Sequence, residues 1–375
     1  MKSPPPTSPV KGWLQQLEKH GAYMQQMLDE LHKLMETIDR PLKLMEVCGT
    51  HTVEIFRHGI RDVIPKGITL LSGPGCPVCV TSVQDVDAAI AIAKNPGVIM
   101  ATFGDMMRVP GGTKSLLEAR SEGADVRVLY SPIDALTLAQ KEPDREVVFF
   151  ATGFETTSPL IAGTLAHAEP AGTKNFTIFT AHKLVPPALK ALLDSTDVQV
   201  DGFILPGHVS TIIGTRPYGF VAAHYGKPSV VTGFAAAEII EGILMIVRQI
   251  AEKRAAVEIQ YTSVVRPEGN PRAVALLEKY FEPVDAYWRG IGNIPGSGLK
   301  LREQYAAFDA NIKFHPPASD AKEPVLCSCG DILRGVKVPT ECALFGTGCT
   351  PDSPVGPCMV STEGSCAAYY KYGGQ

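Results

Sequence analysis

Between residues 42 and 265, short apolar runs rich in β-branched residues alternate with segments of helical periodicity. This alternation is typical of parallel strands joined by crossover helices, so it predicts an α/β fold. Eight of the runs are strand-like, which is enough for two doubly wound parallel-sheet domains facing a common cleft. The predicted strands are residues 42–47, 68–71, 98–102, 126–130, 147–151, 176–180, 202–205 and 229–232.

The regions on either side of this alternation have different patterns. After a Pro-rich lead, residues 11–39 place apolar side chains at helical spacing, which predicts a long amphipathic helix. Beyond residue 266 repeated prolines interrupt the pattern, and six of the nine cysteines lie beyond residue 326. The sequence therefore predicts a lead and helix at 1–40, α/β domains at 41–145 and 146–265, and a cysteine-rich domain at 266–375.

The composition is that of a globular enzyme, with 45% hydrophobic and 20% charged residues in a chain of 375. The 35 Lys and Arg residues are balanced by 39 Asp and Glu residues, and no basic run is long enough to follow a phosphate backbone, so nucleic acid is not an expected partner. No signal-peptide core or apolar stretch of bilayer length occurs, so we expect no membrane association and a cytoplasmic location. In that reducing compartment, cysteines bind metals or cycle between redox states more often than they form permanent disulfides.

Polar or glycine-rich loops follow six of the predicted strands. In open α/β sheets ligands gather where strand ends meet helix N-termini, so these loops predict one cleft. Among their side chains, Asp105, Glu155, His182 and His208 are candidates for acid–base roles or for orienting metal ligands. A structural hydrogen bond is an equally good interpretation of each.

Three cysteines follow the first two predicted strands. Cys76 and Cys79 form a CxxC pair, whose spacing lets both sulfurs reach one metal ion or each other. Cys48 follows the first strand, and His51 lies close behind it. Because neighbouring strand ends meet, the three thiols are expected to converge on one iron or zinc ion with an open position. Buried, inert thiols are the alternative interpretation, and a thioredoxin-like dithiol is disfavoured because a third cysteine lies within reach.

The six cysteines of the last domain are spaced as CxC followed by four single cysteines. The surrounding segment has little apolar periodicity, so we expect a metal or a covalent link to hold it together. The paired CxxC knuckles of zinc ribbons do not occur there, and the irregular spacing fits four ligands of an iron–sulfur cluster plus one additional pair better. The spacing leaves open which four are the ligands among Cys327, Cys329, Cys342, Cys349, Cys358 and Cys366.

Several stretches of the chain are long and unusual enough to be specific: EVCGTHT at 46–52, GPGCPVC at 73–79, TFGDMMRVPG at 102–111, ATGFETT at 151–157, LPGHVS at 205–210 and the tail from CSCGDILRG to GSCAAYYKY. Together they resemble the HypD family of hydrogenase maturation factors over nearly the whole chain. The resemblance implies a scaffold on which the Fe(CN)2(CO) unit of [NiFe]-hydrogenase is assembled. The implied partners are the small chaperone HypC, which shares the iron, the protein HypE, which delivers cyanide, and the hydrogenase large subunit, reached through the chaperone.

The resemblance also implies roles for the cysteines. Cys48 would be the most direct ligand of the Fe(2+) that carries CO and cyanide, with Cys76 and Cys79 beside it and His51 orienting or tuning them. In the tail the resemblance implies a [4Fe-4S] cluster beside a redox-active pair, an arrangement likened to ferredoxin–thioredoxin reductase. By that analogy Cys327, Cys342, Cys349 and Cys366 bind the cluster, and Cys329 and Cys358 form the exchangeable pair.

Two other functions remain open from the residues alone. One is an iron–sulfur thiol–disulfide oxidoreductase in which Cys76 and Cys79 are the dithiol and Cys48 has no role. The other is a zinc-stabilised interaction protein without electron transfer. Iron and sulfide in the purified protein would exclude zinc, and infrared bands from bound CO and cyanide would exclude the plain oxidoreductase.

Overall fold

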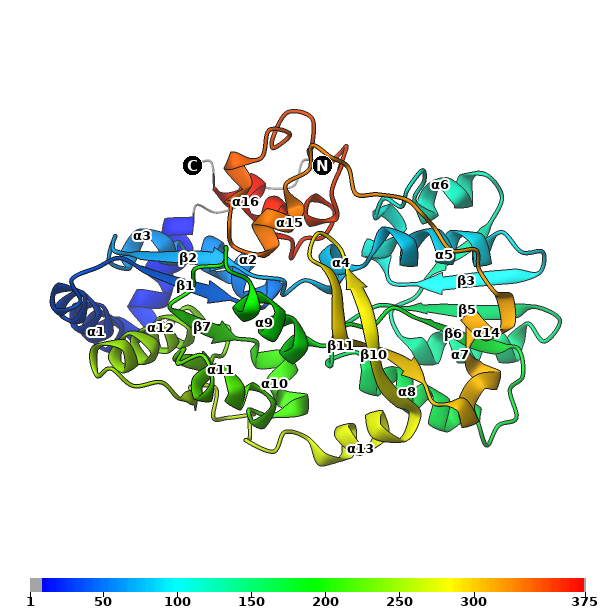
Figure 1. Ribbon diagram of the computed structural model, residues 1–375, viewed down its shortest axis with the longest axis horizontal. Coiled ribbons are helices and arrows are strands. Elements are labelled where there is room, and N and C mark those ends of the chain that lie inside the picture. Colours follow the sequence, from blue (N-terminus) through cyan, green and yellow to red (C-terminus); the bar gives the residue numbers. More distant parts are fainter. Residues whose placement is uncertain (1–8, 374–375) are drawn as a thin grey trace.

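The computed structural model describes residues 9–373, with side chains from residue 21 onward, and shows two α/β units side by side with a cysteine-rich region packed over their junction (Figure 1). Each unit contains one parallel sheet, which confirms the predicted fold class. Most of the Pro-rich lead lies outside the described residues. Within those residues no helix is both long and apolar enough to cross a membrane.

The first sheet has the strand order β2–β1–β7–β8–β9, and all neighbouring strands are parallel. The helix predicted at 11–39 is α1 (Pro9–Thr37), which packs against α12 (Ala236–Ala251). Strands β7 and β8 are buried along their whole length, as expected for apolar runs in a parallel sheet covered by helices. The strands are β1 (Leu42–Glu46), β2 (Ile68–Ser72), β7 (Gly202–Leu205), β8 (Ser229–Val231) and β9 (Val257–Ile259).

The second sheet has the order β4–β3–β5–β6 and is also entirely parallel. Its central strand β3 is fully buried, and β5 is buried except at its first residue. The strands are β3 (Val98–Thr102), β4 (Asp125–Val128), β5 (Glu146–Ala151) and β6 (Phe176–Thr180).

All eight predicted strands are present, with ends that differ by at most two residues. The sequence does not predict β9, because its three half-buried residues form no apolar run. The sheets also cut across the predicted boundary between residues 145 and 146, since β5 pairs with β3, whereas β7 pairs with β1. Consecutive strands are neighbours in roughly two-thirds of cases, and the chain departs from that rule where β2 is followed by β3 and where β6 is followed by β7, since each of these steps leads to the other sheet.

The chain passes from one sheet to the other in residues 73–97 and 181–201. The first contains α4 (Pro77–Val80) and α5 (Val83–Ala93), and the second contains α9 (Val185–Asp194). Lys183 Nζ in the second segment lies 3.1 Å from Asp85 Oδ2 in the first, and the lysine side chain is almost fully buried. A buried ammonium group requires such a partner, so this ion pair ties the two segments together.

A hairpin of β10 (Phe281–Trp288) and β11 (Gly292–Leu301) runs along the junction of the units (Figure 1). The Leu184 N–H donates to Ser297 O at 2.8 Å, and the buried Trp288 donates to Ser297 Oγ at 2.8 Å. The sequence does not predict this hairpin, because Pro283 and Pro295 interrupt both runs and proline is unusual inside paired strands.

The remaining helices are short, and most belong to the crossovers between strands. They are α2 (Gly49–Arg57), α3 (Ile60–Val63), α6 (Leu116–Ser121), α7 (Pro132–Lys141), α8 (Ser158–Ala168), α10 (Gly207–Ile213), α11 (Gly219–Ala223), α13 (Pro271–Tyr280), α14 (Ala310–Phe314), α15 (Cys329–Leu333) and α16 (Ser365–Tyr372). The 3-10 helices are η1 (Gly104–Arg108), η2 (Arg216–Tyr218), η3 (Glu303–Phe308), η4 (Pro339–Glu341) and η5 (Pro357–Met359).

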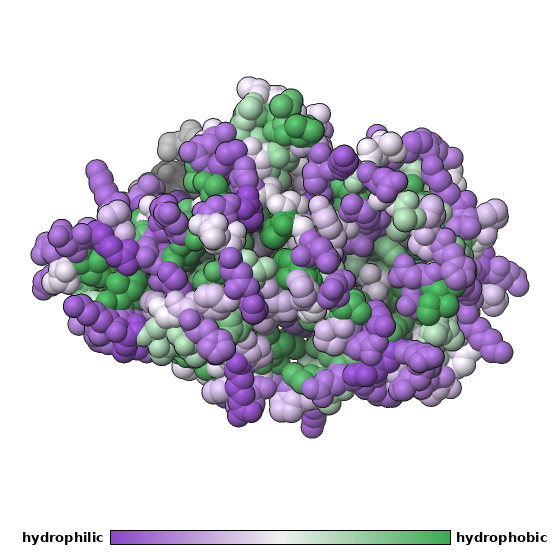
Figure 2. Space-filling model, viewed as in Figure 1, coloured by the Kyte–Doolittle hydropathy of each residue, from purple (hydrophilic) through white to green (hydrophobic). Residues whose placement is uncertain are grey.

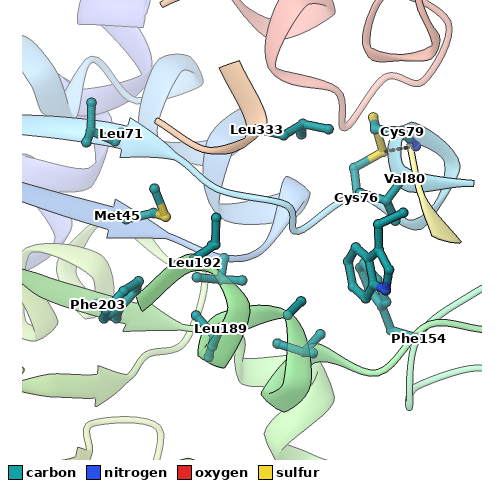
Figure 3. Close-up of a cluster of buried hydrophobic side chains, with 14 of the residues drawn as sticks. Met45, Leu71, Cys76, Cys79, Val80, Phe154, Leu189, Leu192, Phe203 and Leu333 are labelled. Carbon is teal, nitrogen blue, oxygen red and sulfur yellow. Dashed lines mark hydrogen bonds between the residues drawn. A yellow bond between two sulfur atoms is a disulfide. The ribbon is translucent and has the colours of Figure 1, made fainter. Parts of the chain in front are cut away.

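One apolar cluster extends from the first unit through the junction into the cysteine-rich region (Figure 3). Met45 and Leu71 come from the first sheet, Leu189 from α9, and Leu333 from α15. The cysteine-rich region therefore shares its core with the α/β units. In the face shown in Figure 2 the surface is mostly hydrophilic over both units, and hydrophobic side chains gather at the tip of the cysteine-rich region.

Candidate redox and metal-binding site

The loops that follow β1 and β2 pack directly against each other. The N–H of Gly49 donates to Gly75 O at 2.9 Å. A Cβ atom at residue 75 would lie 2.2 Å from the backbone nitrogen of Cys48 and 2.4 Å from its Cα. Only glycine allows the two loops to approach this closely, and the approach places Cys76 beside the Cys48 loop.

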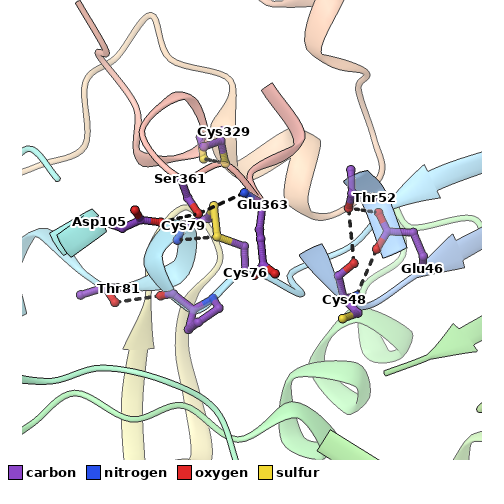
Figure 4. The surroundings of a disulfide bond; sticks show 12 residues. Glu46, Cys48, Thr52, Cys76, Cys79, Thr81, Asp105, Cys329, Ser361 and Glu363 are labelled. Carbon is purple, nitrogen blue, oxygen red and sulfur yellow. Dashed lines mark hydrogen bonds between the residues drawn. A yellow bond between two sulfur atoms is a disulfide. The ribbon is translucent and has the colours of Figure 1, made fainter. Parts of the chain in front are cut away.

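Cys76 and Cys79 form a disulfide at the start of α4 (Figure 4). Cys76 is the N-cap residue, its Sγ accepts a hydrogen bond of 3.2 Å from the N–H of Cys79, and Pro77 occupies the first turn. Both cysteines are buried. The CxxC pair is therefore present in its oxidised form, with its two sulfurs bonded to each other.

Cys48 is a free, buried thiol at the N-terminus of α2. Burial raises its pKa to about 12, and the nearby carboxylates of Glu363 and Glu46 act in the same direction. The Cys48 N–H donates to Glu46 Oε2 at 3.1 Å, and Thr52 Oγ1 donates to Glu46 Oε1 at 2.5 Å. In the absence of a metal ion this thiol keeps its proton, so binding iron here must displace that proton.

The His51 ring contacts the loop that follows β8. Its Nε2 lies 2.9 Å from both Gly233 O and Thr232 Oγ1, and its ring stacks on Phe234. Since a carbonyl oxygen only accepts hydrogen bonds, Nε2 carries the proton. Burial lowers the imidazole pKa to about 4. His51 therefore holds α2 against the loop after β8 as a neutral group, and its ring makes no hydrogen bond to Cys48.

Of the other candidate side chains from the strand-end loops, only His208 shares a neighbour with His51, since both rings stack on Phe234. Asp105 accepts a hydrogen bond of 3.1 Å from Ser361 Oγ, and Glu155 accepts one of 3.0 Å from the N–H of Val185 at the start of α9. His182 is buried, and neither of its ring nitrogens has a partner in the part of the chain that the structure describes. His208 stacks on Phe234 at a centroid distance of 4.0 Å.

A segment of the cysteine-rich region reaches the loops around Cys48 (Figure 4). Thr50 Oγ1 donates to Glu363 Oε1 at 2.7 Å. The sequence patterns do not single out Glu363 or Ser361, although both lie in the tail motif that carries the family resemblance. No local pattern marks them, because their partners are more than 250 residues away along the chain.

All six cysteines of the tail line one small cavity, together with Ile332, Leu344, Phe345 and Met359. The sulfurs of Cys329 and Cys358 lie 2.7 Å apart. Hydrogen bonds from the Cys327 and Cys358 thiols, with the charge of Arg289 acting in the same direction, lower the pKa of Cys329 well below its usual value. Cys329 also hydrogen-bonds to Cys327, and Cys358 also hydrogen-bonds to Cys366, so the exchangeable pair and the four cluster ligands both stay predictions.

The tail pair and the CxxC disulfide belong to the same buried cluster. Cys76, Cys79, Cys329 and Cys358 are all members of the cluster that crosses the junction, and η5, which contains Cys358, packs against α4. Figure 4 shows Cys329 on the side of the disulfide that faces the tail. The geometry therefore brings a disulfide and a pair of neighbouring thiols together in an apolar environment.

Among the side chains of residues 21–373, no group of three or more His, Cys, Asp or Glu residues is arranged to hold a metal ion. Of the three cysteines that are expected to converge on a metal ion, Cys76 and Cys79 are bonded to each other, and only Cys48 is a free thiol. The predicted ligand roles of Cys48, Cys76 and Cys79 are therefore not tested by the geometry, and they require the reduced form of the CxxC pair.

A family model named HypD, described as "Hydrogenase formation hypA family", matches residues 22–373. The chain belongs to the HypD family. A hydrogenase maturation factor HypD from Azotobacter vinelandii is 50% identical over 343 residues, which cover 90% of each chain. The hydrogenase maturation factor HypD of Escherichia coli K12 is 44% identical over 340 residues, or 90% of this chain and 91% of the relative.

A third relative gives a similar match. A putative hydrogenase expression/formation protein from Methanocaldococcus jannaschii is 46% identical over 351 residues, which cover 94% of this chain and 97% of that protein. The resemblance that the motifs indicate is thus confirmed over nearly the whole chain, including both α/β units and the cysteine-rich region.

Proposed function

We propose that this member of the HypD family is the scaffold on which the Fe(CN)2(CO) unit of [NiFe]-hydrogenase is assembled. The observation that carries the proposal is the buried cluster in which the Cys76–Cys79 disulfide, the Cys329–Cys358 thiol pair and the loop of Cys48 meet. A scaffold for iron that accepts CO and cyanide needs soft thiolate donors and a supply of electrons, and this arrangement can provide both.

The iron is the cargo in this proposal, and Cys48 is its most direct ligand. The thiol lies at the end of β1, where the strand-end loops of the first sheet meet. Reduction of the disulfide would release Cys76 and Cys79 as two further thiol donors beside it. His51 contributes by fixing α2, and with it the backbone of Cys48, through its contacts to Thr232 and Gly233.

The tail suits a [4Fe-4S] cluster by the chemistry of its donors. Six cysteines face one cavity whose other lining residues are apolar, and thiolates are the usual ligands of such clusters. We propose Cys327, Cys342, Cys349 and Cys366 as the ligands. When bound, the cluster would supply single electrons that reduce the neighbouring pair from its disulfide form to two thiols. This pair is Cys329 and Cys358, which are not among the proposed cluster ligands.

The pair and the disulfide can exchange electrons without a further reactant. The thiolate of Cys329 attacks a sulfur of the Cys76–Cys79 bond, which forms a mixed disulfide and leaves one CxxC thiolate. Cys358 then attacks the sulfur of Cys329, which releases the second CxxC sulfur. The net step transfers two electrons and two protons, so that Cys329–Cys358 becomes the disulfide and Cys76 and Cys79 become thiols.

The proposed partners are a small chaperone of the HypC type, which shares the iron, and HypE, which delivers cyanide. We place chaperone docking at the loops that contain Gly49, Gly73 and Gly75. From the sequence, glycines in these loops can be interpreted as keeping side-chain bulk away from the metal, but a Cβ atom at residue 75 would lie 2.2 Å from the backbone nitrogen of Cys48. This glycine allows two loops to pack and does not open a path.

The test is anaerobic co-purification with the chaperone, followed by iron and sulfide analysis and infrared spectroscopy. We expect CO and cyanide bands in the wild-type complex and none in Cys48→Ser, while cluster content and fold are unchanged. A Cys48→Ser complex with bands of normal intensity would remove Cys48 from the ligand set. Iron and sulfide without any such bands in the wild type would favour the iron–sulfur thiol–disulfide oxidoreductase, which the paired dithiol and disulfide also fit.

A further inference from the structure

A second pocket of about 190 Å³ lies on the outer side of the tail cysteines. Its walls include Arg289 from the turn of the hairpin, Glu323 from the linker before the tail, and Cys327 and Cys329. Both cysteines and Gly356 also line the inner cavity that contains all six tail cysteines. The two spaces therefore share a wall, and a molecule in the outer pocket lies next to the sulfur-lined cavity.

The guanidinium of Arg289 is fixed in this pocket. Its side chain is 1% exposed, Nε donates to Glu323 Oε2 at 2.8 Å, and Nη1 donates to Pro110 O at 2.8 Å. The backbone N–H of Arg289 donates to Val80 O at 2.9 Å, directly after Cys79. The hairpin turn is thus held against the CxxC helix, and its buried charge faces the tail.

The hairpin turn also fixes the opposite wall of the pocket. Gly290 has a φ of +73°, and a Cβ atom there would lie 2.5 Å from the Cα of Gly330 in α15. Glycine is required at both residues for this approach. The distance between Arg289 and the start of α15 is therefore set by backbone contact and does not depend on flexible side chains.

Two polar atoms of the pocket have no partner. Arg289 Nη2 and Glu323 Oε1 are both buried without a hydrogen bond in the described part of the chain. Nη2 can only donate, and the carboxylate oxygen accepts when it is ionised. A ligand that satisfies both must present an acceptor to the arginine and a donor to the glutamate.

We propose that this pocket binds a small thiol that carries both a carboxylate and an ammonium group, with free cysteine as the simplest example, and that the thiol reduces the tail pair. The carboxylate accepts from Arg289 Nη2, the ammonium donates to Glu323 Oε1, and the sulfur faces Cys329. Pockets for drug-sized ligands measure roughly 300–1,000 Å³, so a pocket of this size suits a smaller molecule. The inference rests on the proposed function, because a reductant acts here only if Cys329 and Cys358 form a disulfide during the cycle.

The chemistry consumes two thiols. The first attacks Cys329, which lines the outer pocket, forms a mixed disulfide with it and releases Cys358 as a thiolate. The second thiol attacks the sulfur of the bound small molecule, releases a small-molecule disulfide and leaves Cys329 as a thiolate. The two protons lost by the small thiols are taken up by Cys329 and Cys358, so that atoms and electrons balance.

The test measures the reduction rate of the oxidised cluster-loaded protein, anaerobically, by alkylation of new thiols and mass spectrometry of the peptides of Cys329 and Cys358. The probes are L-cysteine, cysteamine, which lacks the carboxylate, and 3-mercaptopropionate, which lacks the ammonium group. We expect Arg289→Met to slow L-cysteine and 3-mercaptopropionate at least tenfold and to leave cysteamine unchanged. Glu323→Gln should slow L-cysteine and cysteamine and leave 3-mercaptopropionate unchanged. Comparing each variant with wild type for the same thiol cancels differences in intrinsic reactivity.

Arg302→Met is the matched control, because Arg302 lies at the other end of the same hairpin and bonds to Glu278 O. If Arg289→Met does not fold, the wild type still gives a test. Its rate should saturate with L-cysteine and rise linearly with 2-mercaptoethanol, which has neither charged group. Linear dependence on both thiols, or equal slowing of all three probes by Arg289→Met, would overturn the inference. If no Cys329–Cys358 disulfide forms on oxidation, the redox role in the proposed function fails instead.

Discussion

The Thr50 hydroxyl donates a hydrogen bond of 2.7 Å to Glu363, and this contact joins the helix that follows Cys48 to the cysteine-rich tail. Beside it, the backbone of Gly49 lies so close to the tail that a Cβ at residue 49 would be 2.6 Å from the Cβ of Glu363. Two residues earlier, Ser361 donates to Asp105 of the other unit. One short tail segment therefore touches both units next to the proposed iron ligand (Figure 4).

Replacing Thr50 with valine should loosen this segment and expose Cys48. Hydrogen bonds to charged groups contribute about 1.5–3 kcal/mol, so we expect a loss of stability in that range and faster alkylation of Cys48 under anaerobic conditions. Thr137→Val is the control, because its hydroxyl bonds only to Ile133 O within its own helix. Equal alkylation rates in wild type and Thr50→Val would show that the tail segment does not limit access to Cys48.

Substitutions should distinguish the proposed cluster ligands of the tail from the exchangeable pair Cys329 and Cys358. We expect Cys342→Ala and Cys349→Ala to lose iron and sulfide and to loosen the tail, because structural metal sites contribute folding free energy. Cys329→Ser and Cys358→Ser should keep the cluster and fail in maturation. Iron and sulfide per chain, together with proteolysis of the tail, measure both effects. Full cluster content in either alanine variant removes that cysteine from the proposed ligands.

Local apolar runs identify the strands of this fold, but they do not say which sheet a strand joins. β7 and β1 pair across more than 150 residues, and only burial in the folded chain selects that pairing. The residues of the site also fall into two groups, those that local sequence patterns mark and those that they do not. Cys48, Cys76 and Cys79 are marked by their places after strands, and the tail cysteines by their number. Glu363 and Arg289 reach the site from distant segments and carry no local signal, so they emerge only in the structure.

The stability of the junction should depend on pH through Glu155. Burial raises the pKa of this carboxyl from 4.5 to about 7, although the hydrogen bond from the N–H of Val185 acts to lower it. The folded state therefore holds the proton more tightly than the unfolded state. The stability from Glu155 is fully present below pH 4.5 and is lost as the pH rises through about 7. The loss amounts to roughly 3 kcal/mol, since one pKa unit corresponds to about 1.4 kcal/mol.

Glu155→Gln keeps an acceptor for the Val185 N–H and removes the titration. We therefore compare the free energy of unfolding of wild type and variant by denaturant titration at pH 5 and at pH 8. Relative to the variant, the wild type should lose on the order of 3 kcal/mol of stability between these two pH values. A constant difference for Glu155→Gln would mean that the carboxyl titrates near its ordinary pKa.

Substitution of Gly75 separates two interpretations of the glycines near Cys48. If glycine serves access to the metal, alanine should be tolerated and only a bulky residue should interfere. The structure instead places the backbone of Cys48 where a Cβ of residue 75 would be, at 2.2 Å from its nitrogen. Gly75→Ala should therefore push the loops after β1 and β2 apart and weaken the bond from the Gly49 N–H to Gly75 O. Overpacking costs about 1–3 kcal/mol in ordinary cores, and backbone atoms yield less than side chains, so we expect the upper end of that range.

Gly163→Ala is the control for this change, because a Cβ added at residue 163 would meet no neighbouring side chain or segment within 4 Å. Thermal unfolding and the rate of reduction of Cys76–Cys79 by a fixed concentration of dithiothreitol measure the effect. Displaced loops should lower the unfolding temperature and speed the reduction, since both cysteines are buried in the wild type. A Gly75→Ala variant that matches wild type in both measurements would restore the access interpretation.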